Sequence, residues 1–274
     1  GLVGSEMCIR DSSRKEIDKL TDFVKTYRAK GLAYTRWTHE GRTSSFEKFL
    51  TEEEIAGIHQ ALEAEEGDLL LSLKEPPKLS ATPGKPLEGI TVMVDPGHGN
   101  KDCGAYGAAG LYGPAEAELN LAVSLAVRDR LEQMGATVIM TRETDDRETP
   151  KIVLDERVRM AVDAKPDFFL SIHHNSTGLT KYVSADWTVS YYCEDDSETY
   201  AANLAAAVTG ATDRDTKGEE WGYYYVTRLG FCPAVLFEVG FIPNPEQYEA
   251  CADWETICET ASGLAEGLLR SVPR

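Results

Sequence analysis

Apolar residues follow two spacings along the chain, and each spacing predicts a different element. From residue 90 onward, short apolar runs rich in β-branched residues are separated by longer stretches in which apolar residues recur with a helical period. Strands are predicted at residues 90–94, 136–141, 167–172, 187–192, 223–228 and 234–238, and helices at residues 116–134, 152–164, 198–208 and 254–269. This alternation predicts an α/β fold with a mainly parallel twisted sheet and helices on both faces.

A small helical segment is predicted before this region, over residues 13–73. Ile17, Leu20 and Phe23 begin a 3.6-residue period. Thr51 and Glu54 form a capping-box pattern, which predicts the start of a second helix. We expect these helices to carry no chemistry, because their polar positions have the pattern of an ordinary solvated face.

The two ends of that segment have other patterns. Residues 1–12 have neither the helical nor the strand period, and they resemble translated read-through of a sequencing adapter. We therefore expect a non-native artefact there, and these residues are left out of the fold prediction. Residues 74–89 contain Pro76, Pro77, Pro83 and Pro86, a density that predicts a linker. The chemistry is therefore expected in a domain over residues 90–274.

Composition and charge narrow the class of protein. Hydrophobic residues make up 42% and charged residues 27% of 274 residues, as in globular domains. The net charge of −18 argues against a nucleic-acid partner, because phosphate binding relies on clustered Lys and Arg. No apolar run reaches the roughly 18 residues of a transmembrane helix. The six cysteines include no CxxC pair, which argues against a cysteine-based zinc site.

Histidines and carboxylates stand where the predicted strands end. His98 follows the first strand, His173 follows the strand 167–172, and Glu238 ends the strand 234–238, while Glu116 opens a helix. In an open α/β sheet, ligands bind beyond the carboxyl ends of the strands. Two histidines and one carboxylate with an open position form a catalytic zinc set, and a further carboxylate can act as general base.

Each of these residues also has an ordinary structural interpretation. His98 fits a loop cap, His173 a buried core histidine, and Glu116 a carboxylate favoured at a helix N-terminus. Glu238 is harder to explain in this way. It interrupts an apolar run, and an unpaired buried carboxylate is destabilising. The joint placement of the four residues favours the metal site.

Six short motifs are spread over most of the predicted domain. They are VDPGHG from Val94, DCGA from Asp102, EAELNL from Glu116, TRETD from Thr141, SIHHN from Ser171 and PAVLFEVGFIPN from Pro233. With these motifs in this order, residues 90 to about 269 resemble the catalytic domain of the type 3 family of N-acetylmuramoyl-L-alanine amidases. The resemblance implies hydrolysis of the amide bond between N-acetylmuramic acid and L-alanine in peptidoglycan.

The resemblance also implies roles for particular residues. It implies one Zn²⁺ per chain, held by His98, Glu116 and His173, with Glu238 as the catalytic glutamate. Asp95 is expected to orient the loop that carries His98. Such an enzyme acts on the cell wall, so we expect an extracytoplasmic location. No signal peptide is visible, and we expect the amino terminus to be truncated.

Two neighbouring residues compete with the implied ligands. His174 follows His173 directly, and adjacent residues on a strand point to opposite faces, so both should not reach one metal. We interpret His174 and Asn175 as possible substrate contacts. Glu118 competes with Glu116, but the two lie about 200° apart around a helix, and the motif spacing favours Glu116.

Two other functions remain as alternatives. The same ligand set would serve a zinc peptidase that cuts within the stem peptide. A catalytically silent wall-binding module is a second alternative, which would require a damaged ligand set, whereas all four positions are intact. The sequence carries no indication of an oligomeric state.

Overall fold

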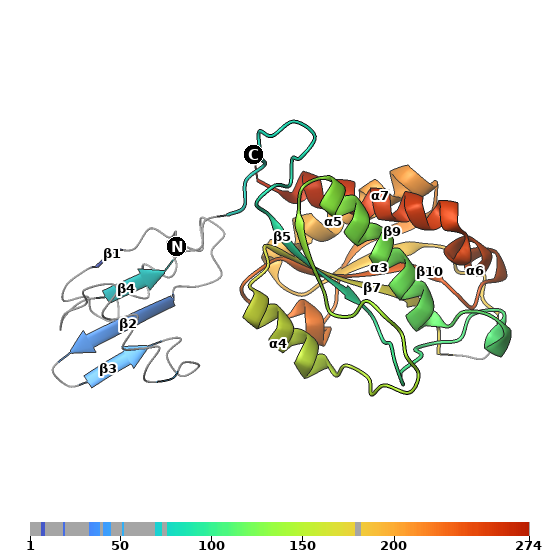
Figure 1. Ribbon diagram of the computed structural model, residues 1–274, viewed down its shortest axis with the longest axis horizontal. Helices are drawn as coiled ribbons and strands as arrows, with labels where there is room; N and C mark the ends of the chain where they lie inside the picture. The colour runs from blue at the N-terminus through green and yellow to red at the C-terminus, as the bar shows by residue number, and fades with distance from the viewer. Residues whose placement is uncertain are drawn as a thin grey trace. The chain divides into compact units, whose positions relative to one another are not determined.

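A six-stranded, mostly parallel sheet forms the centre of the unit Pro77–Arg274 (Figure 1). Neighbouring strands are parallel except for β10 and β8, which are antiparallel. The strand order is β6 (Thr137–Met140), β5 (Thr91–Pro96), β7 (Phe168–Asn175), β10 (Ala234–Phe241), β8 (Thr188–Tyr192) and β9 (Thr216–Trp221). The predicted α/β class is confirmed.

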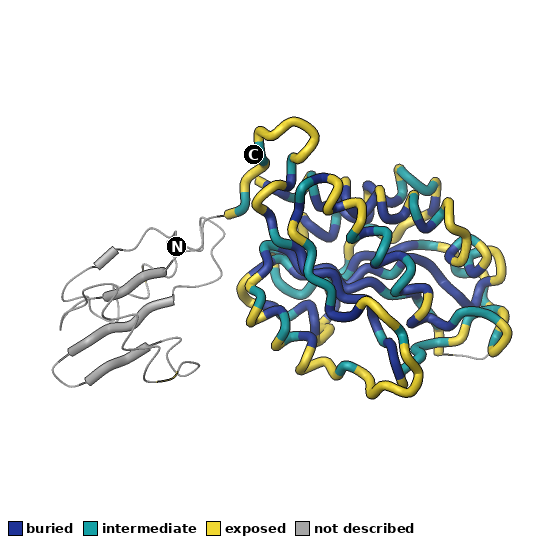
Figure 2. The backbone as a smooth tube through the Cα atoms, in the orientation of Figure 1, coloured by how far each residue is buried: buried dark blue, intermediate teal, exposed yellow. Residues whose placement is uncertain are grey.

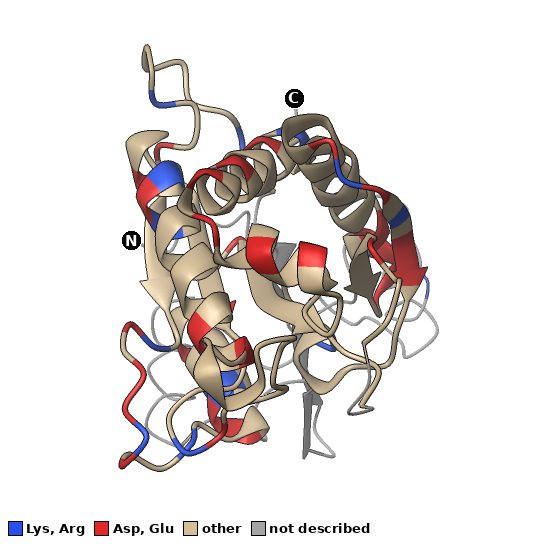
Figure 3. Cartoon of the chain, turned by 90° about the vertical axis from the view of Figure 1, so that its right-hand side faces the viewer, with Lys and Arg blue, Asp and Glu red and all other residues tan. Residues whose placement is uncertain are grey.

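The computed structural model describes residues 76–178 and 182–273. In the unit Gly1–Pro76 it describes Lys19, Thr51 and the backbone of four strands. Among the described residues, no helix is both long enough and apolar enough to cross a membrane. Asp and Glu outnumber Lys and Arg by 46 to 28, and Figure 3 shows acidic residues spread over several helices.

Helices cover both faces of the sheet, and the central part of the backbone is buried (Figure 2). Each face of the sheet has its own apolar cluster. One face packs against α3 (Glu116–Gln133), α5 (Asp195–Thr212) and α7 (Trp254–Ser271). The other face packs against α4 (Leu154–Ala164) and the segment around the short 3₁₀ helix η3 (Tyr225–Thr227). The central strands are buried on both faces, which explains their nearly continuous apolar runs.

Glycines let α5 and α7 approach closely. A Cβ at Gly263 would lie 2.7 Å from the Cα of Val208, and one at Gly267 would lie 2.7 Å from the Cα of Leu204. Backbone cannot yield as a flexible side chain can, so a larger residue at either position would push the helices apart. This packing fixes the helical layer over the face that carries Val235 and Phe237.

The prediction of a strand at residues 223–228 is wrong. That stretch contains η3. The strand in this part of the chain is β9, which ends just before residue 223 and lies at one edge of the sheet. β9 is an edge strand with the sequence TKGEEW, so it lacks the apolar run of a buried strand. An additional helix, α6 (Pro245–Ala252), begins at the N-cap Asn244, whose side chain accepts a hydrogen bond from the Glu246 amide at 3.0 Å.

The helical prediction for residues 13–73 is wrong at the three stretches of that range where the structure describes strands, although Lys19 is helical. Its strands are β1 (Met7–Cys8), β2 (Ala33–Thr38), β3 (Gly41–Ser44) and β4 (Leu69–Ser72), and they pair antiparallel in the order β1-β4-β2-β3. Aromatic and β-branched residues favour strand in β2, and Met7–Cys8 lies within the stretch left out of the fold prediction. The helices predicted from Ile17 and from Thr51 fall almost entirely outside the described residues.

Candidate metal centre

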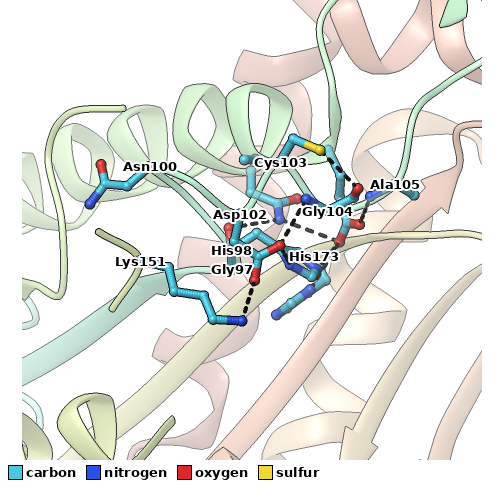
Figure 4. A network of polar contacts seen from close by, with 12 residues as sticks. Gly97, His98, Asn100, Asp102, Cys103, Gly104, Ala105, Lys151 and His173 are labelled. Carbon is cyan, nitrogen blue, oxygen red and sulfur yellow. Dashed lines mark hydrogen bonds and ion pairs between the residues drawn. The ribbon is translucent and has the colours of Figure 1, made fainter. Parts of the chain in front are cut away.

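His98, Glu116 and His173 converge at the carboxyl edge of the sheet. His98 lies in the loop after β5, Glu116 is the first residue of α3, and His173 lies near the end of β7. One potential ligand atom from each side chain lies within 4.8 Å of the other two. Figure 4 shows the two imidazole rings close together. The sequence predicted this grouping from the ends of separate strands.

The Glu116 carboxylate is the centre of the group. Its Oε1 lies 3.2 Å from His98 Nε2 and 3.0 Å from His173 Nδ1, while its Oε2 accepts a hydrogen bond from the Ala105 amide at 2.9 Å. Burial would raise the pKa of Glu116, but the contacts with His173 and His98 outweigh burial and hold that pKa well below its usual range. The carboxylate is therefore ionised and can hold a cation.

The donor set fits a zinc ion. Two imidazole nitrogens and a carboxylate oxygen face one another, and a set of this composition binds Zn²⁺ with a further position open. The thiol of Cys103 donates instead to the Gly104 carbonyl, with 3.3 Å between sulfur and oxygen, and is not one of the converging groups. Among the residues that the structure describes, the converging donors are thus nitrogen and oxygen atoms.

The loop after β5 holds His98 in an uncommon backbone conformation. His98 has a φ of 56° and Asn100 a φ of 58°, both in the left-handed region. Arg157 Nη2 donates to the His98 carbonyl at 2.5 Å, which fixes the backbone at this point. The conformation directs the Nε2 atom of His98 toward Glu116.

Asp102 contacts the second nitrogen of the His98 ring. Its Oδ1 lies 3.1 Å from His98 Nδ1 and accepts a hydrogen bond from the Gly104 amide at 3.2 Å. Lys151 Nζ lies 3.5 Å from the other carboxylate oxygen (Figure 4). A carboxylate in this position fixes the orientation of a ligating histidine. The only signal of this role in the sequence is that Asp102 opens one of the six motifs.

Gly97 provides the space for the second imidazole. A Cβ at this position would lie 2.2 Å from His173 Nε2, so any side chain there would displace the ring. Its carbonyl accepts hydrogen bonds from Arg142 Nη2 at 2.9 Å and from Asn120 Nδ2 at 3.1 Å. The glycine of the VDPGHG motif is therefore required by a close approach of backbone and ring.

Asp95 acts on the His98 loop through Arg157. The two form an ion pair with side chains 1% and 4% exposed, and Arg157 also donates to the carbonyls of Pro96 and His98. Burial alone would raise the pKa of Asp95, but Arg157 and the hydroxyls of Thr141 and Ser171 hold it below its usual value. The loop is thus tied to a buried charge pair.

Replacing Asp95 with asparagine should destabilise the fold by roughly 3–5 kcal/mol, because Arg157 would keep a buried charge without its partner. Denaturant unfolding monitored by circular dichroism measures the change. Glu266→Gln is the matched control. It removes an exposed pair with Arg270 and should change stability by less than about 1 kcal/mol. Equal effects of the two substitutions would contradict this account.

The same pair predicts the direction of a pH effect. The pKa of Asp95 is lowered in the folded protein, so its ionised form stabilises the fold above the pKa of an unfolded aspartate, about 3.9. This stabilisation is lost as the pH falls through the folded pKa. The difference in stability between wild type and Asp95→Asn should therefore shrink in strong acid.

His174 lies on the opposite face of β7 from His173. It is buried, and its Nδ1 lies 2.7 Å from Asn120 Oδ1 beneath α3. Burial lowers the pKa of His174 to about 3, so the ring is neutral. A substrate contact does not fit this buried position. Asn175 ends β7, and its carbonyl accepts a hydrogen bond from the Ile242 amide at 3.1 Å.

Glu118 is directed away from the converging group. Its Oε2 accepts a hydrogen bond from the Ala115 amide at 2.7 Å, which caps the start of α3, and lies 3.3 Å from Arg147 Nη2. Asn120, one helical turn beyond Glu116, instead faces the site, with its Nδ2 3.5 Å from Glu116 Oε1. Asn120 was not predicted as a site residue, although it belongs to the EAELNL motif.

Glu238 lies beside His173 on the neighbouring strand. The two residues are partners in the parallel pairing of β10 and β7, so their side chains share a face. Glu238 Oε2 is shielded from solvent and has no hydrogen-bond partner among the described residues. Burial raises the pKa of Glu238 to about 7. A carboxylate with this pKa can take up and return a proton near neutral pH.

Family models match both units of the chain. The model described as N-acetylmuramoyl-L-alanine amidase matches residues 92–270, a range that includes all four residues of the candidate site. A second model, described as the GAD domain, matches residues 7–78.

Known proteins are similar to more than half of the chain. YqiI of Bacillus subtilis strain 168 is 33% identical over 188 residues, covering 69% of the chain and 87% of that protein. The N-acetylmuramoyl-L-alanine amidase LytC of B. subtilis is 36% identical over 169 residues, 58% of the chain but only 31% of LytC. The solved catalytic domain of CwlV, an N-acetylmuramoyl-L-alanine amidase from Bacillus (Paenibacillus) polymyxa var. colistinus, gives a TM-score of 0.60 at 32% identity, over 66% of the chain and 97% of that domain.

Proposed function

Because the chain belongs to the N-acetylmuramoyl-L-alanine amidase family, we propose that it is a zinc-dependent hydrolase of the bond between N-acetylmuramic acid and L-alanine in peptidoglycan. The observation that carries the proposal is the convergence of His98, Glu116 and His173 beside Glu238. A similar protein of Staphylococcus saprophyticus carries the name probable cell wall amidase LytH, so we also propose action outside the cytoplasm.

The proposed roles follow from the contacts of each residue. His98, Glu116 and His173 would hold one zinc ion, and Asp102 would keep the His98 ring oriented. A zinc ion in such a site polarises the amide carbonyl and lowers the pKa of water toward about 7. Glu238 takes the proton of the attacking water and returns it to the leaving nitrogen of L-alanine.

The products of digestion test the proposed bond. Purified peptidoglycan is incubated with the protein, and the released fragments are identified by mass spectrometry. Intact stem peptides that begin with a free L-alanine amine are the expected result. Fragments cut inside the stem peptide would favour the zinc peptidase, and wall binding without any release would favour the silent module.

Metal removal should abolish the activity. Dialysis against a strong chelator should stop the release of stem peptides, and one equivalent of Zn²⁺ should restore it, because the three proposed ligands offer a single site. Metal analysis and the digestion assay are made on the same samples. Full activity in a metal-free, chelator-treated sample would contradict the proposal.

A further inference from the structure

Exposed aromatic side chains gather between β9 and α4, outside the metal centre. Trp221, Tyr223 and Tyr225 have 64%, 67% and 39% of their surface exposed. Arg228 lies among them, and we call these four residues the aromatic platform. A group of large exposed rings on a protein surface commonly marks a binding site. The proposed catalytic roles use none of these four residues.

The rings of the platform are held in place. Trp221 and Tyr223 are stacked, with centroids 6.2 Å apart and an interplanar angle of 22°. The Arg228 guanidinium carbon lies 4.5 Å from the centres of both the Tyr223 and the Tyr225 rings. Trp221 Nε1 donates to the Cys193 carbonyl at 3.2 Å. A surface fixed in this way loses little conformational entropy when it binds a ligand.

Two side-chain contacts connect the segment that carries the platform to the rest of the domain, and the first leads to the face of the sheet that carries Glu238. Tyr224 packs on Tyr191 with ring centroids 4.9 Å apart. Tyr191 pairs with Leu236, which lies two residues before Glu238 and therefore shares its face of the sheet.

The second contact is a hydrogen bond to α4. The Tyr225 hydroxyl donates to Asp155 in the first turn of α4, and Arg157 of the same helix donates to the His98 carbonyl. The segment that carries the platform therefore spans from the strand beside β10 to the helix that holds the His98 loop. Because this segment and α4 cover the sheet, a glycan strand that extends from the metal centre toward Trp221 passes over their outer surface, where the platform is exposed.

The chemistry of the platform suits a sugar. The flat face of a pyranose ring carries C–H groups, which pack favourably on the electron-rich face of an aromatic ring. Guanidinium N–H groups can donate to hydroxyl and N-acetyl oxygens. Stacking on a neutral sugar needs no opposite charge, which agrees with a chain of net charge −18.

We propose that the aromatic platform of Trp221, Tyr223, Tyr225 and Arg228 is a carbohydrate-binding subsite for an N-acetylated sugar of the glycan strand. This inference rests on the proposed function, because that function makes the glycan strand the substrate. The subsite holds the strand at a distance from the cleaved amide bond, so the platform residues position the substrate and are not catalytic.

Binding to peptide-free glycan tests the platform directly. The probe is a soluble oligomer of β-1,4-linked N-acetylglucosamine, which is neutral and N-acetylated, titrated into the zinc-loaded full chain and followed by calorimetry. Trp221→Ala and Tyr223→Ala should each weaken binding by about tenfold, the scale of a lost aromatic contact. Trp221→Phe keeps a ring and should restore most of the affinity. Tyr112→Ala removes a 99% exposed aromatic residue at the 3₁₀ helix Gly110–Tyr112 and should bind like wild type.

Kinetics on two substrates separate the possible outcomes. On long glycan strands, Trp221→Ala should raise KM by about tenfold with a much smaller change in kcat, whereas on a single muramoyl peptide its KM should change little.

Wild-type affinity and KM in both alanine variants would overturn the inference and leave the proposed function standing. Sugar binding through these residues without release of stem peptides would support the subsite and overturn the proposed function. Self-association that both alanine variants abolish, without any glycan binding, would assign the platform to a second copy of the chain and overturn the inference.

Discussion

Replacing Glu238 with glutamine should reduce the release of stem peptides by about 10²–10⁴ and leave the zinc content near one per chain. The amide keeps the shape of the side chain but cannot accept the proton of the attacking water. Glu238 reaches the site from β10 and is not one of the three converging ligand groups, so the metal should remain bound. The digestion rate and the zinc content are measured on the same folded sample.

Two outcomes would contradict the role of Glu238. A folded Glu238→Gln protein without zinc would make the carboxylate a ligand, and the general base would have to be another residue. A folded, zinc-loaded and fully active protein would make Glu238 a structural residue. Its Oε2 atom, shielded and without a hydrogen-bond partner among the described residues, favours a role in proton transfer.

Replacing His173 with alanine should remove both the zinc and the activity. The ring supplies one of the three converging donors, and its loss should weaken zinc binding by more than the roughly 10–100-fold that follows loss of an outer-shell partner. Zinc affinity is measured by competition with a chelating dye, which gives a result independent of activity.

Cys103→Ser provides the matched control for His173→Ala. Cys103 lies in the loop between two of the proposed ligands, but its thiol donates to the Gly104 carbonyl, which a hydroxyl can also do. This variant should keep its zinc and most of its activity. Loss of zinc from Cys103→Ser, or full zinc binding by His173→Ala, would show that the ligand set is different.

The sequence predicts the parts of the fold that are buried on both faces. The runs at β5, β7 and β10 are apolar because helices cover both sides, and the end of each run identified a residue of the candidate site. β9 was not predicted, because it is a polar edge strand and lacks an apolar run. The tyrosines that follow it were interpreted as a strand, but these β-favouring residues form the aromatic platform.

Contacts between distant segments set the limit of prediction within the site. The alternation of β7 predicted that His173 and His174 face opposite sides, yet only the packing of α3 shows that His174 meets Asn120 in the interior. Likewise, Asp95 was expected to orient the His98 loop, but its partner Arg157 lies 62 residues away on α4. Such pairings depend on tertiary structure and have no local pattern.

The unit Gly1–Pro76 shows the weakness of periodicity as a signal. A helical spacing was inferred across residues 13–73, while β2, β3 and β4 occupy parts of that range. Short strands such as Gly41–Ser44 are polar and have too few residues to establish a period. Their pairing with other strands, rather than their own composition, determines their conformation.

The most direct test of the account is an anomalous difference map, measured at the zinc absorption edge on a crystal of the zinc-loaded protein. The account predicts one strong peak per chain, within bonding distance of His98, Glu116 and His173 and beside Glu238. A zinc peak bound by a different set of residues, or full occupancy of zinc elsewhere with these three side chains still in contact with one another, would contradict it.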